Sequence, residues 1–252
     1  MATWQGVGTG NWSNSLNWLF FTPPNVSTVA TISSGNVIVD TTGLTALLVD
    51  LSGNRTVDVG VGGGLSVGVE FGIDSGSTLV VHDAGSVSAG QYSVSGRLVV
   101  GGATAGVADT SGTVLGLVNL NTGGKLVFNT NDQSTFSSAI IGSGSVEQNG
   151  SGAGSFVTLS GANSYTGGTT INSSTLFALG GNAIGNSSAV VVNAPGEFGV
   201  LNSEAIGSLA GGGSVNLFNS STLTTGGNNA STARRQPKPW LRQPCSPARW
   251  RL

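Results

Sequence analysis

The stretch "SGSTLVV" at residues 75–81 returns as "VSGRLVV" at 94–100 and as "TGGKLVF" at 122–128. In each copy a turn that contains Gly precedes alternating polar and apolar residues, which is the pattern of a short β-strand with one buried face. The central leucines of the three copies are 19 and then 28 positions apart. Because this spacing drifts over roughly 20–30 residues, it favours a β-helix with turns of variable length over a strictly regular solenoid or propeller.

The same alternation continues through residues 1–233, and we find no window with helical periodicity and capping signals. We therefore predict an all-β chain folded as a parallel β-helix (β-solenoid). Its coils would stack about 4.8 Å apart, and some ten coils of around 22 residues would form continuous apolar columns inside. An antiparallel β-sandwich is the alternative. It would need frequent Asn-Gly or Asp-Gly hairpin turns, and the sequence contains one, Asn149-Gly150.

The composition leaves few groups for chemistry. Of 252 residues, 42 are Gly, 38% are hydrophobic and only 8% are charged. The many Val, Thr and Ile residues argue against disorder, and Gly follows no three-residue period, which excludes collagen. The single cysteine, Cys245, cannot form an internal disulfide. The fold must therefore depend on backbone hydrogen bonds and a long apolar core.

Charge divides the chain into two parts. Six of the nine basic residues lie in residues 234–252, and all eleven acidic residues precede them, so residues 1–233 carry 3 − 11 = −8. We predict a β-helical domain over 1–233 and a disordered or irregular basic tail, rich in Pro and Trp, over 234–252. An out-of-frame reading of the gene explains this tail best. A basic arm that binds anionic membrane or nucleic acid is the alternative.

One longer stretch carries a family resemblance. The sequence "LSGANSYTGGTTINSSTLFALGGNAIGNSSAVVVN" at 159–193 closely resembles the autotransporter-associated β-strand repeat, mainly through residues 161–163 and 165–171. The N-terminal "TWQGVGTGNWSNSLNW" at 3–18 looks like the Trp-Asn-Trp opening that often precedes such repeats. The resemblance implies a right-handed parallel β-helix from the secreted passenger region of a bacterial autotransporter. The sequence departs from the family pattern after the repeat, where Pro195 is expected in a turn.

The repeat motif also predicts local structure. Gly167 and Gly168 are expected to turn a corner with backbone angles that a Cβ forbids. We expect the amide of Asn163 to bond to nearby backbone or to stack with an Asn of the next coil. Tyr165 is expected to cover the end of the core with its hydroxyl in water. These roles are all structural.

Candidate catalytic groups are scarce. His82, the only histidine, excludes a two-His metal site, and it is expected to be exposed and inert after a strand. The dispersed acidic residues are expected to be solubilising surface groups, although stacked coils could bring Asp50, Asp74 or Asp83 together as in a glycosidase. Phosphate-binding loops, an EF-hand and a Cys cluster are not found. We predict no catalytic, cofactor-binding or metal site, and no cofactor.

The sequence therefore predicts a non-enzymatic, exported β-helical passenger fragment that acts as a stalk or adhesin, outside the cell or on the bacterial cell surface. Its expected partners are a host or matrix surface, a glycan, or further copies of itself, and not nucleic acid. We expect no transmembrane segment, because no run approaches about 20 apolar residues. Neither a signal peptide nor the translocating barrel is expected within this chain. The alternative is a carbohydrate-active β-helix enzyme, such as a polysaccharide lyase or glycosidase.

Overall fold

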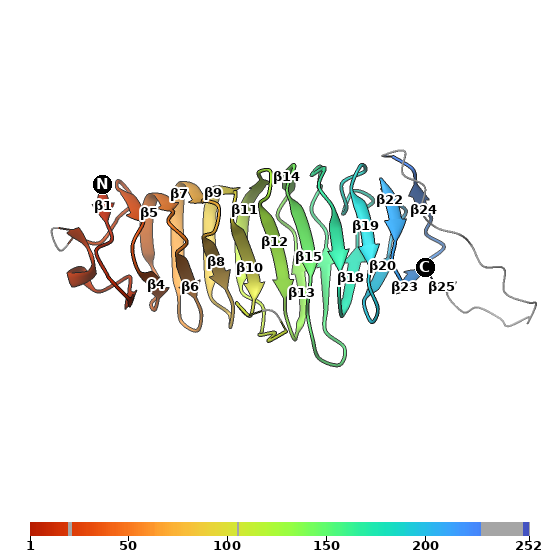
Figure 1. Cartoon of the computed structure of the whole chain (residues 1–252), viewed down its shortest axis with the longest axis horizontal. Helices are drawn as coiled ribbons and strands as arrows, with labels where there is room; N and C mark the ends of the chain where they lie inside the picture. Colours follow the sequence, from red (N-terminus) through yellow and green to blue (C-terminus); the bar gives the residue numbers. More distant parts are fainter. Residues whose placement is uncertain (20–21, 105, 228–248, 252) are drawn as a thin grey trace, which may run out of the picture.

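The computed structural model describes residues 1–19, 22–104, 106–227 and 249–251. The chain forms a rod of short strands that stack along its length as a β-solenoid of about 9 turns, close to the ten expected (Figure 1). One short 3-10 helix, η1 (Ser15–Asn17), lies near the N-terminus. No helix in the described part of the chain has the length and apolar character needed to cross a bilayer.

The strands form three long sheets and one short sheet that run along the rod. The first sheet contains, in order, β1 (Ala2–Thr3), β3 (Val29–Ile32), β5 (Leu44–Leu51), β7 (Gly64–Ile73), β9 (Ser86–Val94), β11 (Thr113–Leu120) and β14 (Ile140–Gly142). The second contains β2 (Thr9–Asn11), β4 (Asn36–Val39), β6 (Thr56–Val59), β8 (Thr78–Val81), β10 (Arg97–Gly101), β12 (Lys125–Asn129), β15 (Ser145–Gln148), β17 (Thr169–Ile171), β19 (Ala189–Val192) and β22 (Ser208–Ala210).

The third sheet begins in the middle of the rod. It contains β13 (Gln133–Phe136), β16 (Phe156–Leu159), β18 (Thr175–Ala178), β20 (Glu197–Val200), β23 (Ser214–Leu217) and β25 (Arg249–Arg251). The short sheet pairs β21 (Glu204–Ile206) with β24 (Leu223–Thr225). Neighbouring strands are parallel throughout these sheets except at β23 and β25. The predicted parallel β-solenoid is therefore confirmed, and the antiparallel sandwich is excluded.

The repeated stretch of the sequence marks equivalent positions of successive coils. Leu98 pairs with Leu79 of the preceding coil and with Leu126 of the following coil. The second interval is nine residues longer (28 − 19 = 9), mainly because the β10–β11 loop, 102–112, is seven residues longer than the β8–β9 loop, 82–85 (11 − 4 = 7). The β11–β12 loop, 121–124, is also two residues longer than the β9–β10 loop, 95–96 (4 − 2 = 2). The variable spacing thus lengthens loops and leaves the register of the second sheet intact. In the first sheet, β11 pairs with β9 through one register shift between Leu115 and Leu117.

The core follows from strand alternation. In β6, for example, Val57 and Val59 are buried, whereas Asp58 between them points outward because successive side chains of a strand face opposite sides. Burying one Val or Leu side chain contributes about 1.5–3 kcal/mol, and every coil adds several. This alternation also places the polar residues discussed below on the outer surface of the second sheet.

Three tryptophans close the N-terminal end of the core. Trp4, Trp12 and Trp18 are fully buried, and the Trp18 ring lies edge-on to the other two at centroid distances of 5.1 and 5.0 Å. The indole nitrogen of Trp18 also donates a 2.8 Å hydrogen bond to the Trp12 carbonyl oxygen. The aromatic opening of the sequence therefore acts as a cap on the first coil.

Two expectations for the repeat motif have opposite outcomes. Asn163 behaves as predicted, since its Oδ1 accepts from the Ile140 amide at 2.8 Å and its Nδ2 donates to the Ala183 carbonyl at 2.6 Å. The prediction for Tyr165 was wrong: the side chain is fully buried, and its hydroxyl lies 2.6 Å from Thr169 Oγ1. An interior hydroxyl partner, which the sequence pattern does not show, makes this burial possible.

The glycines of the motif are needed for a different reason from the one expected. Neither Gly167 nor Gly168 has a positive φ. A Cβ on Gly167 would instead lie 2.0 Å from the carbonyl oxygen of Gly144 in the preceding coil. The corner therefore requires close approach of two backbones, not a left-handed conformation.

Further along, Pro195 lies in the turn between β19 and β20, as predicted. Within the predicted tail, residues 249–251 form β25, which pairs antiparallel with β23. Strand pairing needs only backbone groups, so the basic composition does not prevent it. The rest of the predicted tail, 234–248 and 252, lies outside the described residues.

Candidate functional site

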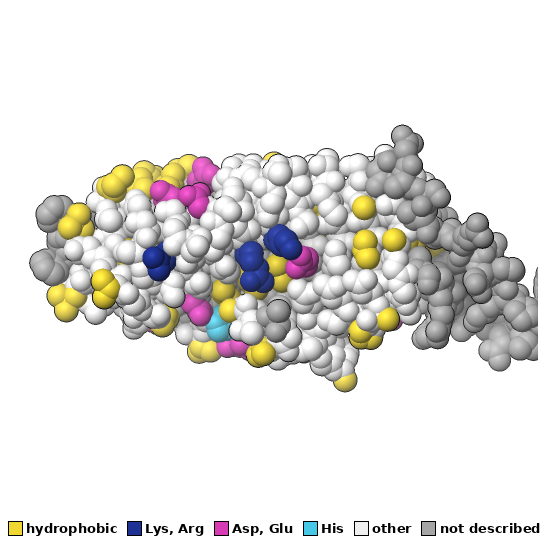
Figure 2. Space-filling model, in the orientation of Figure 1, with side chains coloured by type: hydrophobic (Ala, Val, Ile, Leu, Met, Phe, Trp, Pro, Cys, Tyr) yellow, Lys and Arg dark blue, Asp and Glu magenta, His cyan; other side chains and the backbone are white. Residues whose placement is uncertain are grey.

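Charged side chains gather around His82 on the outer surface of the rod. His82 directly follows β8, and Asp58 lies beside it on the neighbouring strand β6. Asp109 comes from the long loop between β10 and β11. Figure 2 shows the histidine at the surface with acidic side chains on both sides. Three successive coils therefore contribute to one polar cluster, which we call the His82 cluster: Asp58, His82, Asp83 and Asp109.

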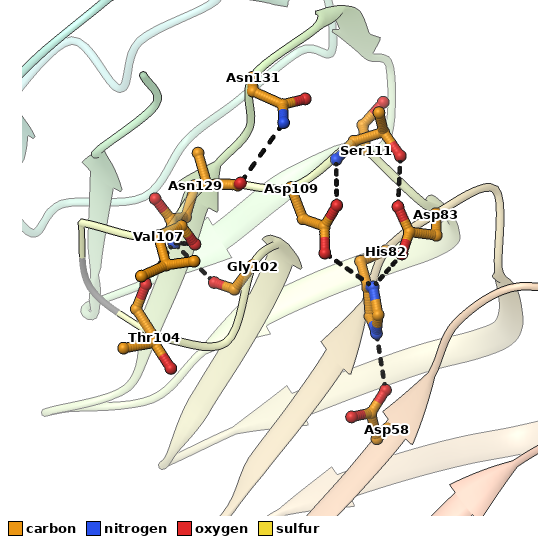
Figure 3. Close-up of polar contacts among 12 residues, drawn as sticks. Asp58, His82, Asp83, Gly102, Thr104, Val107, Asp109, Ser111, Asn129 and Asn131 are labelled. Atoms are coloured by element: carbon orange, nitrogen blue, oxygen red, sulfur yellow. Dashed lines mark hydrogen bonds and ion pairs between the residues drawn. The ribbon is translucent and has the colours of Figure 1, made fainter. Parts of the chain in front are cut away.

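The imidazole ring contacts carboxylates through both nitrogens (Figure 3). His82 Nε2 lies 2.8 Å from Asp58 Oδ1. On the other side, His82 Nδ1 lies 3.0 Å from Asp83 Oδ2 and 3.4 Å from Asp109 Oδ2. The His82 side chain is only 21% exposed. The expectation that His82 is exposed was therefore wrong, and the expectation that it is inert stays a prediction.

Thr110 fixes the two carboxylates that face Nδ1. Its hydroxyl donates a 2.6 Å hydrogen bond to Asp83 Oδ1, and its backbone amide donates one of 3.0 Å to Asp109 Oδ1. The other oxygen of each carboxylate, Oδ2, is the one directed at His82. Orientation of both carboxylates is thus determined by one residue of the loop.

The loop itself is held in place by Asn129. Its Nδ2 lies 2.7, 2.8 and 2.9 Å from the carbonyl oxygens of Gly102, Thr104 and Val107, and the side chain is buried (Figure 3). The backbone continues this contact, since the Asp109 amide donates to the Asn129 carbonyl at 3.1 Å. Asn129 therefore positions Asp109 beside His82.

Electrostatics of the cluster follow from these contacts. Burial lowers the pKa of His82, but the hydrogen bonds and charges of Asp58 and Asp83 outweigh it, so this pKa lies above its ordinary value of 6.5. The hydrogen bond from Thr110 lowers the pKa of Asp83, and its contacts with Asp109 and His82 act in the same direction. The cluster thus favours an ionised Asp83 beside a protonated His82.

The other acids expected to meet are placed differently. Asp50 and Asp74 do approach each other: burial raises the pKa of Asp50, and the charge of Asp74 raises it further. Asp83 is not part of this pair and lies with Asp109 instead. The sequence spacing could have predicted one contact of the His82 cluster, because Asp58 and His82 are 24 residues apart, which is about one coil. The long loop conceals the relation to Asp109.

Two hollows of the described surface are not lined by any residue of the His82 cluster. One of about 270 Å³ separates the start of β11 from β13, and Val114, Ser134 and Phe136 are among its lining residues. The other, of about 490 Å³, is bordered by Asn163 and Asn186 near the C-terminal end of the rod. No carboxylate lines either hollow.

The fold and the His82 cluster define the protein as a β-solenoid with one histidine–carboxylate group on its surface. Comparison with protein-family models, curated proteins and solved structures found no match to this chain. The resemblance of residues 159–193 to the autotransporter-associated repeat therefore stays a prediction from the sequence.

Proposed function

We propose that the chain is a non-enzymatic, exported structural rod that acts as a stalk or adhesin at a bacterial surface. The single observation that carries this proposal is the uninterrupted stack of parallel coils around one continuous apolar core. Such a stack gives length and rigidity from a repeated backbone arrangement and needs no ligand.

The use of the acidic residues supports a structural role. Asp40 accepts hydrogen bonds from Asn11 and Ser13, 29 and 27 residues earlier. Glu204 accepts from the backbone amides of Ala183 and Ile184, about one coil earlier. These carboxylates join neighbouring coils, so their presence does not require catalysis.

A strip of aromatic rings supports the adhesive part of the proposal. Phe156, Phe177 and Phe218 are half-buried on the outside of the third sheet, with ring centroids 5.2 and 5.9 Å apart in succession. A Cβ on Gly199 would lie 2.3 Å from the Phe177 ring, so this glycine leaves room for the ring to lie across its coil. The strip offers an apolar surface to the ring of a sugar or to a matrix protein.

A carbohydrate-active enzyme is the second candidate, and one observation favours it. Three carboxylates converge on His82, and convergent carboxylates are what glycosidases and polysaccharide lyases use. Against this reading, neither described hollow is lined by these groups. We therefore rank it below the structural rod.

Two assays on the full chain separate these candidates. The rod proposal predicts accessibility to antibody and to added protease on intact cells of the source organism, and retention on a glycan or matrix array. It also predicts no cleavage of polyuronates or neutral polysaccharides, and array binding that survives Asp83→Asn. Catalytic turnover that Asp83→Asn abolishes would establish the enzyme instead, and a protein protected inside intact cells would refute surface display.

A further inference from the structure

The unassigned feature with the most specific geometry is the side of His82 that faces Asp83 and Asp109. One ligand atom from each of His82, Asp83 and Asp109 lies within 4.8 Å of the ligand atoms of the other two. The distances from Nδ1 are 3.0 and 3.4 Å. Two atoms bound to one tetrahedral Zn²⁺ at about 2.0–2.1 Å lie about 3.3 Å apart. Both distances from Nδ1 are therefore close to the spacing of two ligand atoms on one metal ion.

Each of these three groups is also oriented by a further contact. Asp58 accepts from His82 Nε2 at 2.8 Å, which leaves Nδ1 for the other side of the ring. Thr110 binds the Oδ1 atoms of Asp83 and Asp109 and leaves both Oδ2 atoms for the centre. Metal-bound histidines typically donate their second nitrogen to a carboxylate in this way, and metal-bound carboxylates are in turn hydrogen-bonded.

The charges of the cluster point to a cation as well. Three carboxylates surround a single imidazole, and no Lys or Arg joins them in the ion pairs of the described residues. Lys125, for comparison, is paired with Glu147. Even a protonated His82 leaves the group with excess negative charge, which a bound divalent ion would neutralise.

We propose that His82 Nδ1, Asp83 Oδ2 and Asp109 Oδ2 bind a divalent transition-metal ion of the Zn²⁺ type, with water completing the coordination. One imidazole with two carboxylates suits such an ion better than Ca²⁺, which takes six to eight oxygen ligands. The ion replaces the proton on Nδ1 and ties the β10–β11 loop to the preceding coil. This site departs from the sequence prediction of no metal site and does not depend on the proposed function.

The chain's single histidine makes the first test direct. The protein is prepared without a tag, with Cys245→Ser to remove the only thiol, and its imidazole is labelled with ¹⁵N. Addition of about one equivalent of Zn²⁺ is expected to shift the Nδ1 resonance strongly. Nε2 should keep its proton, which is hydrogen-bonded to Asp58. Imidazole resonances that stay unchanged at saturating Zn²⁺ would overturn the proposal, and this measurement needs no variant in the cluster.

Calorimetric titration with Zn²⁺ then tests the individual residues. Asp83→Asn and Asp109→Asn are expected to weaken binding by at least about tenfold, and Asp58→Asn, which acts by positioning the ring, by about 10–100-fold. Asp74→Asn is the matched control, a carboxylate elsewhere on the rod, and should bind as the parent does. Equal affinity in the parent, the cluster variants and the control would show binding elsewhere and refute the site.

Discussion

At the scale of single residues, several interior polar groups of this protein bond across coils. Tyr165 is buried with its hydroxyl on Thr169, and Thr169 Oγ1 in turn lies 3.0 Å from Ser188 Oγ. Asn163 joins the coils on both sides of its own. Of these, the role of Asn163 could be predicted because Asn commonly bonds backbone at turns. The burial of Tyr165 could not, because its partners are identified only by the fold.

Replacement of Tyr165 tests the buried hydroxyl chain. We expect Tyr165→Phe to lower the free energy of unfolding by about 1–2 kcal/mol, because the fully buried Thr169 hydroxyl loses a hydrogen-bond partner. Urea denaturation of the two proteins measures this difference. In a protein that already carries Thr169→Val, adding Tyr165→Phe should lower the free energy of unfolding by less. An unchanged urea midpoint in the single variant Tyr165→Phe would contradict the hydrogen bond between Tyr165 and Thr169.

Glu204 predicts a pH dependence. Burial raises the pKa of Glu204 above its ordinary value of 4.5, although the amides of Ile184 and Ala183 oppose this. Because the folded-state pKa is the higher one, the stabilising contribution is complete below pH 4.5 and is lost as pH rises through the raised value. We expect the stability of the parent relative to Glu204→Gln to fall over that interval. Parallel pH profiles for the two proteins would contradict this.

At the scale of strands and coils, the sequence predicts the repeating elements better than the connections. The alternation of polar and apolar residues predicts the strands around Leu79, Leu98 and Leu126. The similarity of these three sequences also predicts their register, because parallel coils stack each leucine on the leucine of the next coil. The His82 cluster could not be predicted, since Asp109 reaches it through a loop of irregular length fixed by Asn129. Side-chain partners across loops depend on three-dimensional contacts that periodicity does not encode.

Leu98 tests the apolar column at this scale. Leu98→Ala should destabilise the protein by about 2–5 kcal/mol, because a fully buried side chain between two other leucines leaves a cavity. Leu115→Ala is the matched control at a side chain that is 53% exposed, where the change should stay within about 0.5 kcal/mol. Chemical denaturation compares the two, and similar losses would contradict the assigned orientation of β10.

At the scale of the whole molecule, the protein is a rod (Figure 1). Three buried tryptophans cap its N-terminal end, and charged side chains are sparse on the face drawn in Figure 2. The alternating pattern predicted this architecture because every coil repeats one arrangement. The backbone pairing of β25 with β23 was not predicted, since it depends on an available strand edge and not on composition. The proposed stalk or adhesin role uses this shape directly.

Distances between spin labels along the second sheet test the stacked architecture most directly. Thr56 is separated from Ser145 by four strand steps and from Ala189 by six, in the order β6, β8, β10, β12, β15, β17, β19. With Cys245 replaced, labels at 56 and 145 should lie about 19 Å apart, and labels at 56 and 189 about 29 Å apart, at about 4.8 Å per step. An increase of about 10 Å between the two pairs is the predicted result. Equal distances, or a shorter distance for the second pair, would contradict a linear stack of parallel coils.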